Sequence, residues 1–336
     1  MSEPLPIAVI GAGRMGAYHA RVCAESPDVA LVAVVDADAR RAAEVAGQYG
    51  AEPATAIDAH LGRISAAVVA VPTDSHLQVA GPLLERGVHC LVEKPLAMTV
   101  RDAEALLQAA DGGGAVLQVG HTERFNPAFM ALGRYDLKPR FIETQRISPC
   151  RFRSMDVGVV MDMMIHDIDL VLSLVRSEIE SIDAVGVNVV AATEDMANVR
   201  VRFADGCVAD MAASRAALKV ERRIRIFAQD GYVGVDFGTK RGVFIRPTAQ
   251  LMALRAAAVK AGRFDSAAVG DESFENLLDV QEIRIDDHDA LGEQLAAFVR
   301  AVRGDAPVVV TGEDGRRAVE LARRIVDDIS ARPMRP

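Results

Sequence analysis

The stretch Ile7-Ala-Val-Ile-Gly-Ala-Gly-Arg-Met-Gly16 places three glycines in GxGxxG spacing directly after a short apolar run. The run is typical of a buried strand, and a helix-like segment follows the glycines. In this context Gly11 permits a tight turn, Gly13 lets backbone amides approach a pyrophosphate, and Gly16 lets the helix pack on the strand. The stretch therefore predicts a dinucleotide-binding loop.

A second part of the same predicted site is Asp36, which follows the last of these glycines by 20 residues. A carboxylate at this place accepts hydrogen bonds from the ribose hydroxyls of adenosine. It also repels a 2′-phosphate, so we predict NAD rather than NADP, with Arg40 and Arg41 close enough to soften the preference. Arg14 and Met15 begin the helix whose positive end faces the pyrophosphate.

Short apolar runs alternate with helix-like segments throughout the first third of the chain. The runs cover residues 7–10, 31–35, 67–71, 90–92 and 116–119, and the helical segments cover 17–26, 40–49, 76–86 and 100–110. Such alternation indicates βαβ units and a doubly wound parallel sheet. The sequence thus predicts an α/β protein whose N-terminal Rossmann domain spans residues 1–121.

The pattern changes to longer alternating runs after this point. Predicted strands at 199–203, 208–212, 223–228 and 232–237 are linked by the turn signals Asp205-Gly206 and Asp230-Gly231. Predicted helices cover 159–175, 290–302 and 313–330, whereas 248–276 shows no period and is expected to be a mobile loop. We predict a second α/β domain over residues 122–336, with an open, mostly antiparallel sheet.

Two clusters carry candidate chemistry. Lys94 follows Glu93 at the end of a buried run, where ligands of doubly wound sheets bind, and its ammonium can stabilise a developing alkoxide. Asp162, His166, Asp169 and Ser173 follow spacings of 4, 3 and 4, which predicts one stripe along a helix. In that arrangement Asp162 would orient the imidazole of His166 and raise its basicity, as a general base requires.

Composition excludes several classes of function. The 336 residues include 38 Lys and Arg against 47 Asp and Glu, a net charge of −9, which argues against nucleic-acid or anionic-membrane binding. No apolar run approaches the ~18 residues of a membrane span. The four cysteines lie far apart without a CxxC pair, so we expect free thiols, no metal site and a cytoplasmic protein.

Four motifs in order resemble the Gfo/Idh/MocA family of NAD(P)-dependent sugar oxidoreductases. They are GxGxxG, Glu93-Lys94-Pro95, the run from Gly120 to Pro127, and Asp162-x3-His166. The resemblance implies a Rossmann domain, a second domain whose open sheet mediates oligomerisation, and Lys94 and His166 as a catalytic pair supported by Asp162. It also implies cofactor contacts near the nicotinamide from Pro72, Thr73, His76 and Glu93. The family's usual Thr-Pro-Asn loop reads Val71-Pro72-Thr73 here.

Within the family, the motifs are most similar to those of UDP-N-acetylglucosamine 3-dehydrogenases. That similarity implies a UDP-sugar substrate, a homodimer or homotetramer, and a PLP-dependent aminotransferase as the pathway neighbour in 2,3-diamino sugar and lipid A synthesis. Residues 121–153 carry seven Lys or Arg against three acids, which suits a diphosphate. The expected substrate-binding residues are His121, Arg124, Asn126, Arg151 and Asp169.

Two other functions stay open from the sequence. One is oxidation of a free polyol or sugar such as inositol, which would need no basic segment. The other is a non-catalytic regulator that senses NAD, although such a protein would not need Lys94, Asp162 and His166.

Overall fold

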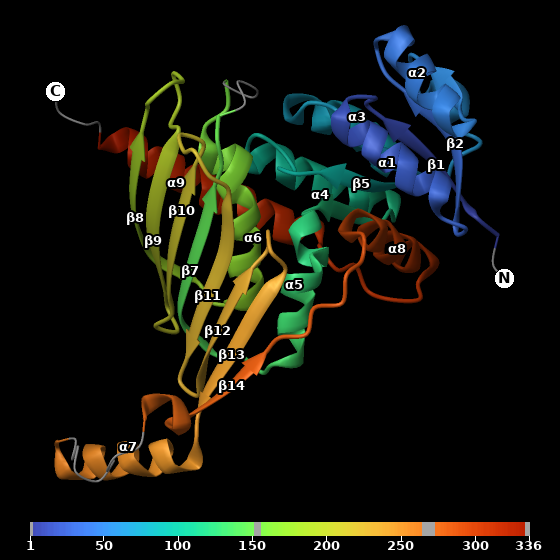
Figure 1. Cartoon of the computed structure of the whole chain (residues 1–336). Coiled ribbons are helices and arrows are strands. Elements are labelled where there is room, and N and C mark those ends of the chain that lie inside the picture. Colours follow the sequence, from blue (N-terminus) through green and yellow to red (C-terminus); the bar gives the residue numbers. More distant parts are fainter. Residues whose placement is uncertain (1–2, 151–155, 264–272, 333–336) are drawn as a thin grey trace.

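The chain from Leu5 to Gly120 builds a six-stranded parallel sheet in the order β3-β2-β1-β4-β5-β6 (Figure 1). The computed structural model describes residues 3–150, 156–263 and 273–332. The strands are β1 (Leu5–Ile10), β2 (Val29–Val35), β3 (Glu52–Ala54), β4 (Ala66–Val69), β5 (His89–Glu93) and β6 (Leu117–Gly120). The helices between them are α1 (Arg14–Glu25), α2 (Ala39–Tyr49), α3 (His76–Glu85) and α4 (Val100–Gly113).

Burial on both faces explains the apolar strands of this sheet. Ala8 and Val9 are adjacent in β1, point to opposite faces, and are both fully buried. Ala8 packs in the cluster that includes α3 and α4 residues, and Val9 packs in the cluster that includes α1 residues. The predicted doubly wound sheet is confirmed.

An eight-stranded sheet follows, in the order β14-β13-β12-β11-β7-β10-β9-β8. All pairs are antiparallel except β7 with β10, so the prediction of a mostly antiparallel sheet is confirmed. The strands are β7 (Pro139–Ile147), β8 (Ile179–Val187), β9 (Met196–Phe203), β10 (Val208–Ser214), β11 (Glu221–Ala228), β12 (Gly231–Asp236), β13 (Arg241–Pro247) and β14 (Leu278–Glu282).

Helices cover one face of this sheet. Helices α6 (Ile165–Leu174) and α9 (Gly312–Ala331) contribute Ile168, Leu321 and Ile325 to a core with inward residues of the strands (Figure 1). The short helix α5 (Pro127–Met130) precedes β7. In the part of the chain that the structure describes, no helix is both long and apolar enough to cross a membrane.

The last two helices join the two sheets. Helix α8 (Ala290–Arg303) places Leu295 and Phe298 in the core of the first sheet, beside α1. Helix α9 contacts α4 of the first unit and α6 and β8 of the second. The division between residues 121 and 122 stays a prediction, but α8 returns to the first sheet.

Two expectations are wrong. Residues 248–276 contain a helix, α7 (Ala249–Ala261), that extends away from the end of the second sheet and buries no side chain (Figure 1). It has no apolar period because it packs on no core, but its alanines favour helix and Thr248 caps it. The segment 159–175 is not one regular helix, since Val160–Met164 form a π-helical turn before α6.

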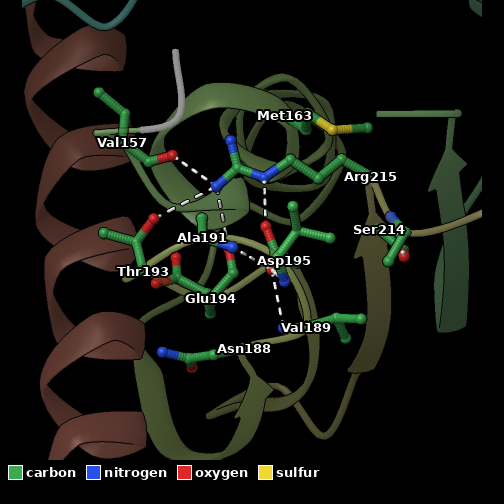
Figure 2. A network of polar contacts seen from close by, with 12 residues as sticks. Val157, Met163, Asn188, Val189, Ala191, Thr193, Glu194, Asp195, Ser214 and Arg215 are labelled. Carbon is green, nitrogen blue, oxygen red and sulfur yellow. Dashed lines mark hydrogen bonds and ion pairs between the residues drawn. The ribbon is translucent and has the colours of Figure 1, made fainter. Parts of the chain in front are cut away.

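A buried ion pair fixes the start of that π turn (Figure 2). Arg215, just after β10, donates from Nε to Asp195 at 2.9 Å and from Nη2 to the backbone oxygen of Val157 at 2.7 Å. Glu194 accepts from the backbone N–H of Val159 through its own backbone oxygen and from that of Val160 through its side chain. The loop between β8 and β9 therefore holds the residues that begin the π turn.

Asp195 is the charged centre of this network. One of its carboxylate oxygens accepts the consecutive backbone N–H groups of Val189, Val190 and Ala191. Burial alone would raise the pKa of Asp195, but these donors and Arg215 lower it from 3.8 to about 2. A carboxyl with a depressed pKa stabilises the fold fully above its unfolded pKa, and the contribution is lost as the pH falls through the folded value.

We therefore expect Asp195→Asn to lower the free energy of unfolding by about 3 kcal/mol near neutral pH, because Arg215 loses its buried carboxylate. The difference from wild type should narrow as the pH falls from 4 towards 2. Urea unfolding followed by circular dichroism at a series of pH values measures it. A difference that stays constant across this range contradicts the assignment.

Candidate active site

The loop between β1 and α1 has the backbone geometry of a pyrophosphate site. Gly11 has a φ of +97°, and a Cβ there would lie 2.5 Å from the backbone oxygen of Ala70. A Cβ on Gly16 would lie 1.6 Å from the backbone oxygen of Gly11. A Cβ on Gly13 would meet nothing within 4 Å, so the N-terminus of α1 borders open space. The loop thus fits the anionic bridge of a dinucleotide.

This space continues into a cavity of about 930 Å³ above the carboxyl ends of the first sheet. The predicted cofactor residues that line it are Gly11, Gly13, Arg14, Met15, Asp36 and Pro72. Gly16 lies below the loop, where it permits close packing of α1. The cavity lies where doubly wound sheets bind dinucleotides.

Asp36 has a second task in addition to lining the cavity. Its carboxylate accepts the backbone N–H of Ala12 at 2.7 Å and that of Asp38 at 2.8 Å, while Arg41 lies 3.4 Å away. Asp36 therefore holds the glycine-rich loop against the end of β2. Its side chain is 11% exposed, so part of the carboxylate remains open to the cavity for a ribose.

Thr73 and His76 do not line this cavity. Thr73 begins a short 3₁₀ turn, Thr73–Ser75, directly before α3. His76 is buried, with Nδ1 3.1 Å from the backbone oxygen of Leu96 and Nε2 3.1 Å from that of Val71. It connects the segments that follow β4 and β5. The structure thus gives His76 contacts that position these two segments, and its contact with the cofactor stays a prediction.

A second cavity of about 720 Å³ adjoins the first and shares Arg14, Met15, Ala70 and Val71 with it. It lies between the two sheets and forms the candidate substrate cleft. Of the predicted residues, Lys94, Asp162, His166, Glu93 and Asn126 line the cleft. The predicted catalytic residues therefore come together beside the dinucleotide cavity.

Lys94 leaves the end of β5 and reaches the π turn. Its Nζ donates to the backbone oxygen of Asp162 at 2.8 Å and lies 3.7 Å from the carboxylate of the same residue. Burial lowers the pKa of Lys94 below its usual value, while the charges of Asp162 and Glu93 oppose the shift. The cation is thus held at a fixed place in the cleft with donors left for a substrate oxygen.

Asp162 does not orient His166 as expected. The π turn changes the hydrogen-bond spacing, so residues four apart do not stack as on a regular helix. Asp162 contacts Lys94, and the buried Nδ1 of His166 has no hydrogen-bond partner among the described residues. Asp162 therefore contacts the ammonium of Lys94 and not the imidazole of His166.

His166 is neutral near physiological pH. Burial lowers the pKa of its imidazole well below 6.5, and the positive charges of Lys94, Arg146 and Arg222 add to the shift. Because Nδ1 is buried, Nε2 is the ring nitrogen available to a ligand in the cleft. A neutral imidazole beside a fixed ammonium can accept a proton from a hydroxyl group.

Two pairs support these residues and were missed from sequence. Arg146 of β7 donates to both oxygens of Asp167, at 3.0 and 2.8 Å, and to Glu123 at 3.0 Å. His19 of α1 lies 2.7 Å from Glu93 through Nε2. Asp167 had a signal in the sequence, since a carboxylate in so apolar a helix needs a buried partner. Nothing in the sequence indicated that its partner would be Arg146 on the distant strand β7.

Burial alone would raise the pKa of Glu93, but His19 and Lys94 hold it below its usual value. Glu93 also accepts the backbone N–H of Lys94 at 3.2 Å. The carboxylate is thus ionised and lies between the imidazole of His19 and the ammonium of Lys94. It fixes the end of β5 from which Lys94 projects.

Arg124 and Asp169 are not at the cleft. Arg124 donates from Nε and Nη2 to the two oxygens of Asp169, at 2.7 and 2.9 Å. Arg124 lines a separate cavity of about 460 Å³ near the start of α9. Arg124 therefore lies away from the lining of the cleft, where its diphosphate contact was expected. Ser173, on the same stripe, donates to the backbone oxygen of Leu170.

The other expected substrate residues have mixed positions. Asn126 lines the cleft and donates to Glu123 at 2.9 Å. His121 is buried, and both its ring nitrogens lack hydrogen-bond partners among the described residues. Arg151 lies outside the described residues.

A dinucleotide cavity joined to a cleft with a lysine and a neutral histidine defines an NAD-dependent oxidoreductase. Residues 5–121 match the "Oxidoreductase family, NAD-binding Rossmann fold", and residues 140–233 match the "GFO/IDH/MocA C-terminal domain". The chain belongs to the Gfo/Idh/MocA oxidoreductase family and has its NAD-binding Rossmann domain.

Similar proteins include two curated enzymes and a solved structure. UDP-N-acetylglucosamine 3-dehydrogenase of Acidithiobacillus ferrooxidans is 35% identical over 94% of this chain and 95% of its own. Its solved structure has a TM-score of 0.86 and 32% identity, covering 98% of this chain and 99% of that one. Inositol 2-dehydrogenase of Rhizobium meliloti is 28% identical over 96% of each chain.

We expect Asp36→Ala to weaken NAD binding about tenfold to a hundredfold, through loss of charge-assisted hydrogen bonds worth ~1.5–3 kcal/mol each. NADP binding should fall less, since the variant no longer repels a 2′-phosphate. Titration of both dinucleotides by fluorescence measures the effect. Asp38→Ala is the control, because Asp38 caps α2 outside the cavity. An equal loss of affinity for NAD and NADP would contradict a ribose contact and would mean that Asp36 only holds the glycine-rich loop in place.

We expect Arg124→Ala to lower the free energy of unfolding by about 3–5 kcal/mol, because it leaves Asp169 buried without its partner. KM for the substrate should stay within twofold at a temperature where the variant is folded. Chemical unfolding and steady-state kinetics measure the two effects. Arg134→Ala is the control, since its pair with Asp286 is exposed and worth about 1 kcal/mol at most. If folded Arg124→Ala has a clearly higher KM, the prediction is wrong and Arg124 contacts the substrate.

Proposed function

We propose that this chain oxidises the 3-hydroxyl of a UDP-sugar, UDP-N-acetylglucosamine, to the 3-keto sugar with NAD. The observation that carries the proposal is the position of Lys94 and His166 in the cleft that adjoins the dinucleotide cavity. The choice of sugar is supported by the similarity to UDP-N-acetylglucosamine 3-dehydrogenase over nearly the whole chain.

The proposed division of labour follows from the contacts. NAD, when bound, supplies the acceptor for the hydride that leaves the sugar carbon. Nε2 of His166 takes the hydroxyl proton as the carbonyl forms. The ammonium of Lys94 stabilises the oxygen while its negative charge grows. Asp162 holds Lys94 in place through its backbone oxygen and carboxylate.

The 3-keto product suits a PLP-dependent aminotransferase, which would install the amine of a 2,3-diamino sugar for lipid A synthesis. We also propose a homodimer or homotetramer formed through the open face of the second sheet. That face carries the aromatic contact between Phe141 and Phe227, and Phe227 is 39% exposed.

The substrate is tested by following NADH formation with UDP-N-acetylglucosamine, free N-acetylglucosamine and myo-inositol. We expect turnover of the UDP-sugar, with a product two hydrogens lighter by mass spectrometry, and little turnover of the other two. Turnover of myo-inositol without turnover of the UDP-sugar would contradict the proposal and favour the function of the Rhizobium meliloti relative.

The chemical step is tested with His166→Asn, which keeps the shape of the side chain and removes the base. We expect kcat to fall by about 10²–10⁴-fold. The wild-type kcat should decline as the pH drops through the pKa of His166, and burial places that decline well below pH 6.5. His166→Asn should lose this acidic limb.

Asp162→Asn should cost less than His166→Asn, since the bond from Lys94 to the backbone oxygen of residue 162 survives. If Lys94→Met removes the acidic limb and His166→Asn keeps it, Lys94 is the base. A kcat close to that of wild type in both Lys94→Met and His166→Asn would show that this cleft is not the catalytic site.

A further inference from the structure

Some of the cationic side chains in the cleft form no ion pair with a carboxylate in the described structure. Five lysine or arginine side chains line it, namely Arg14, Arg21, Lys94, Arg146 and Arg222. Three of them have carboxylate partners: Arg21 pairs with Glu25 and Asp289, Lys94 with Asp162, and Arg146 with Asp167 and Glu123. Within the described ranges, Arg14 and Arg222 have neither an ion pair nor a side-chain hydrogen bond.

The two uncommitted arginines belong to different halves of the site. Arg14 starts α1 and also lines the dinucleotide cavity, so it faces the cofactor. Arg222 lies in β11 of the second sheet and lines only the cleft. Arg222 is thus the cation of the substrate side whose five N–H donors are left unused in the described structure.

Strand register explains why Arg222 faces the cleft. It lies directly opposite Arg146 across the β7–β11 pair, so both side chains are on the same face of the sheet. Two opposed arginines repel one another, but Asp167 and Glu123 neutralise Arg146. The next residue, Arg223, points to the open face and donates to Gln145 at 2.7 Å.

The surroundings of Arg222 tie it to the reacting groups. Its positive charge helps to lower the pKa values of His166 and Glu123, so the guanidinium lies near both. The carboxylates nearby, Asp167 and Glu123, give their oxygens to Arg146 instead. The planar donors of a guanidinium match two oxygens of a phosphate group.

We propose that Arg222 binds the diphosphate of the nucleotide sugar. The assignment rests on the proposed function, in which the substrate carries a diphosphate. The sugar ring would lie between the two ends of the cleft, with its 3-hydroxyl at Lys94 and His166 and the diphosphate on its anomeric carbon at Arg222. Arg222 thereby takes the role that the sequence suggested for Arg124.

The test measures binding of UDP by isothermal titration calorimetry, with turnover as a second readout. We expect Arg222→Gln to weaken UDP binding about tenfold to a hundredfold, to raise KM for the UDP-sugar by a similar factor, and to change kcat less than threefold. Its affinity for NAD should match wild type, which also shows that the variant is folded. The UDP affinity of Arg222→Lys should lie between those of wild type and Arg222→Gln, because lysine keeps the positive charge but lacks the planar set of donors.

Arg223→Gln is the matched control, one residue along and on the opposite face, and should bind UDP as wild type does. Equal UDP affinity in wild type and Arg222→Gln overturns the role of Arg222 and leaves the proposed function standing. Wild-type protein that binds NAD, turns over myo-inositol and does not bind UDP overturns both.

Discussion

The bond from Nζ of Lys94 to the backbone oxygen of Asp162 joins the two halves of this molecule at the point where chemistry takes place. Lys94 comes from the end of a buried parallel strand, and Asp162 comes from a π turn that packs under the second sheet. Neither half contains a complete site. The cofactor cavity and the substrate cleft meet because this contact places an ammonium from one sheet beside an imidazole from the other.

Each end of that contact is held by buried charges. On one side, the ionised Glu93 lies between His19 and Lys94 and fixes the end of β5. On the other, Arg215 and Asp195 fix the residues that enter the π turn. Buried ions are costly unless each is paired, so these networks make the local geometry specific rather than merely stable. The lowered pKa of Lys94 is a result of the same burial.

Much of the first sheet could be predicted from sequence because its signals are local. Apolar runs, glycine spacing and Asp36 each indicate their place without knowledge of distant residues. Lys94 and His166 could also be predicted, since one follows a strand and the other lies in an apolar helix. The partners of charged residues could not, because strand register decides that Arg146 reaches Asp167.

The errors have the same origin. The motif and the number of basic residues placed Arg124 at the substrate, but neither can show that Asp169 takes the Nε and Nη2 donors of its guanidinium. Spacing placed Asp162 beside His166, but spacing assumes a regular helix and the chain forms a π turn. Periodicity failed for α7 because an apolar period records packing, and this helix packs on no core.

The adjacent arginines of β11 also limit how this sequence can evolve. Arg222 and Arg223 face opposite sides of one strand, so inserting or deleting a single residue within β11 would exchange the faces of the residues beyond that point. A substitution alters one side chain, whereas such an indel would turn every cleft residue of the strand to the outer face. Length changes should therefore accumulate in the connection between β10 and β11 beyond the buried Arg215, at residues 216–220, and be rare within the strand itself.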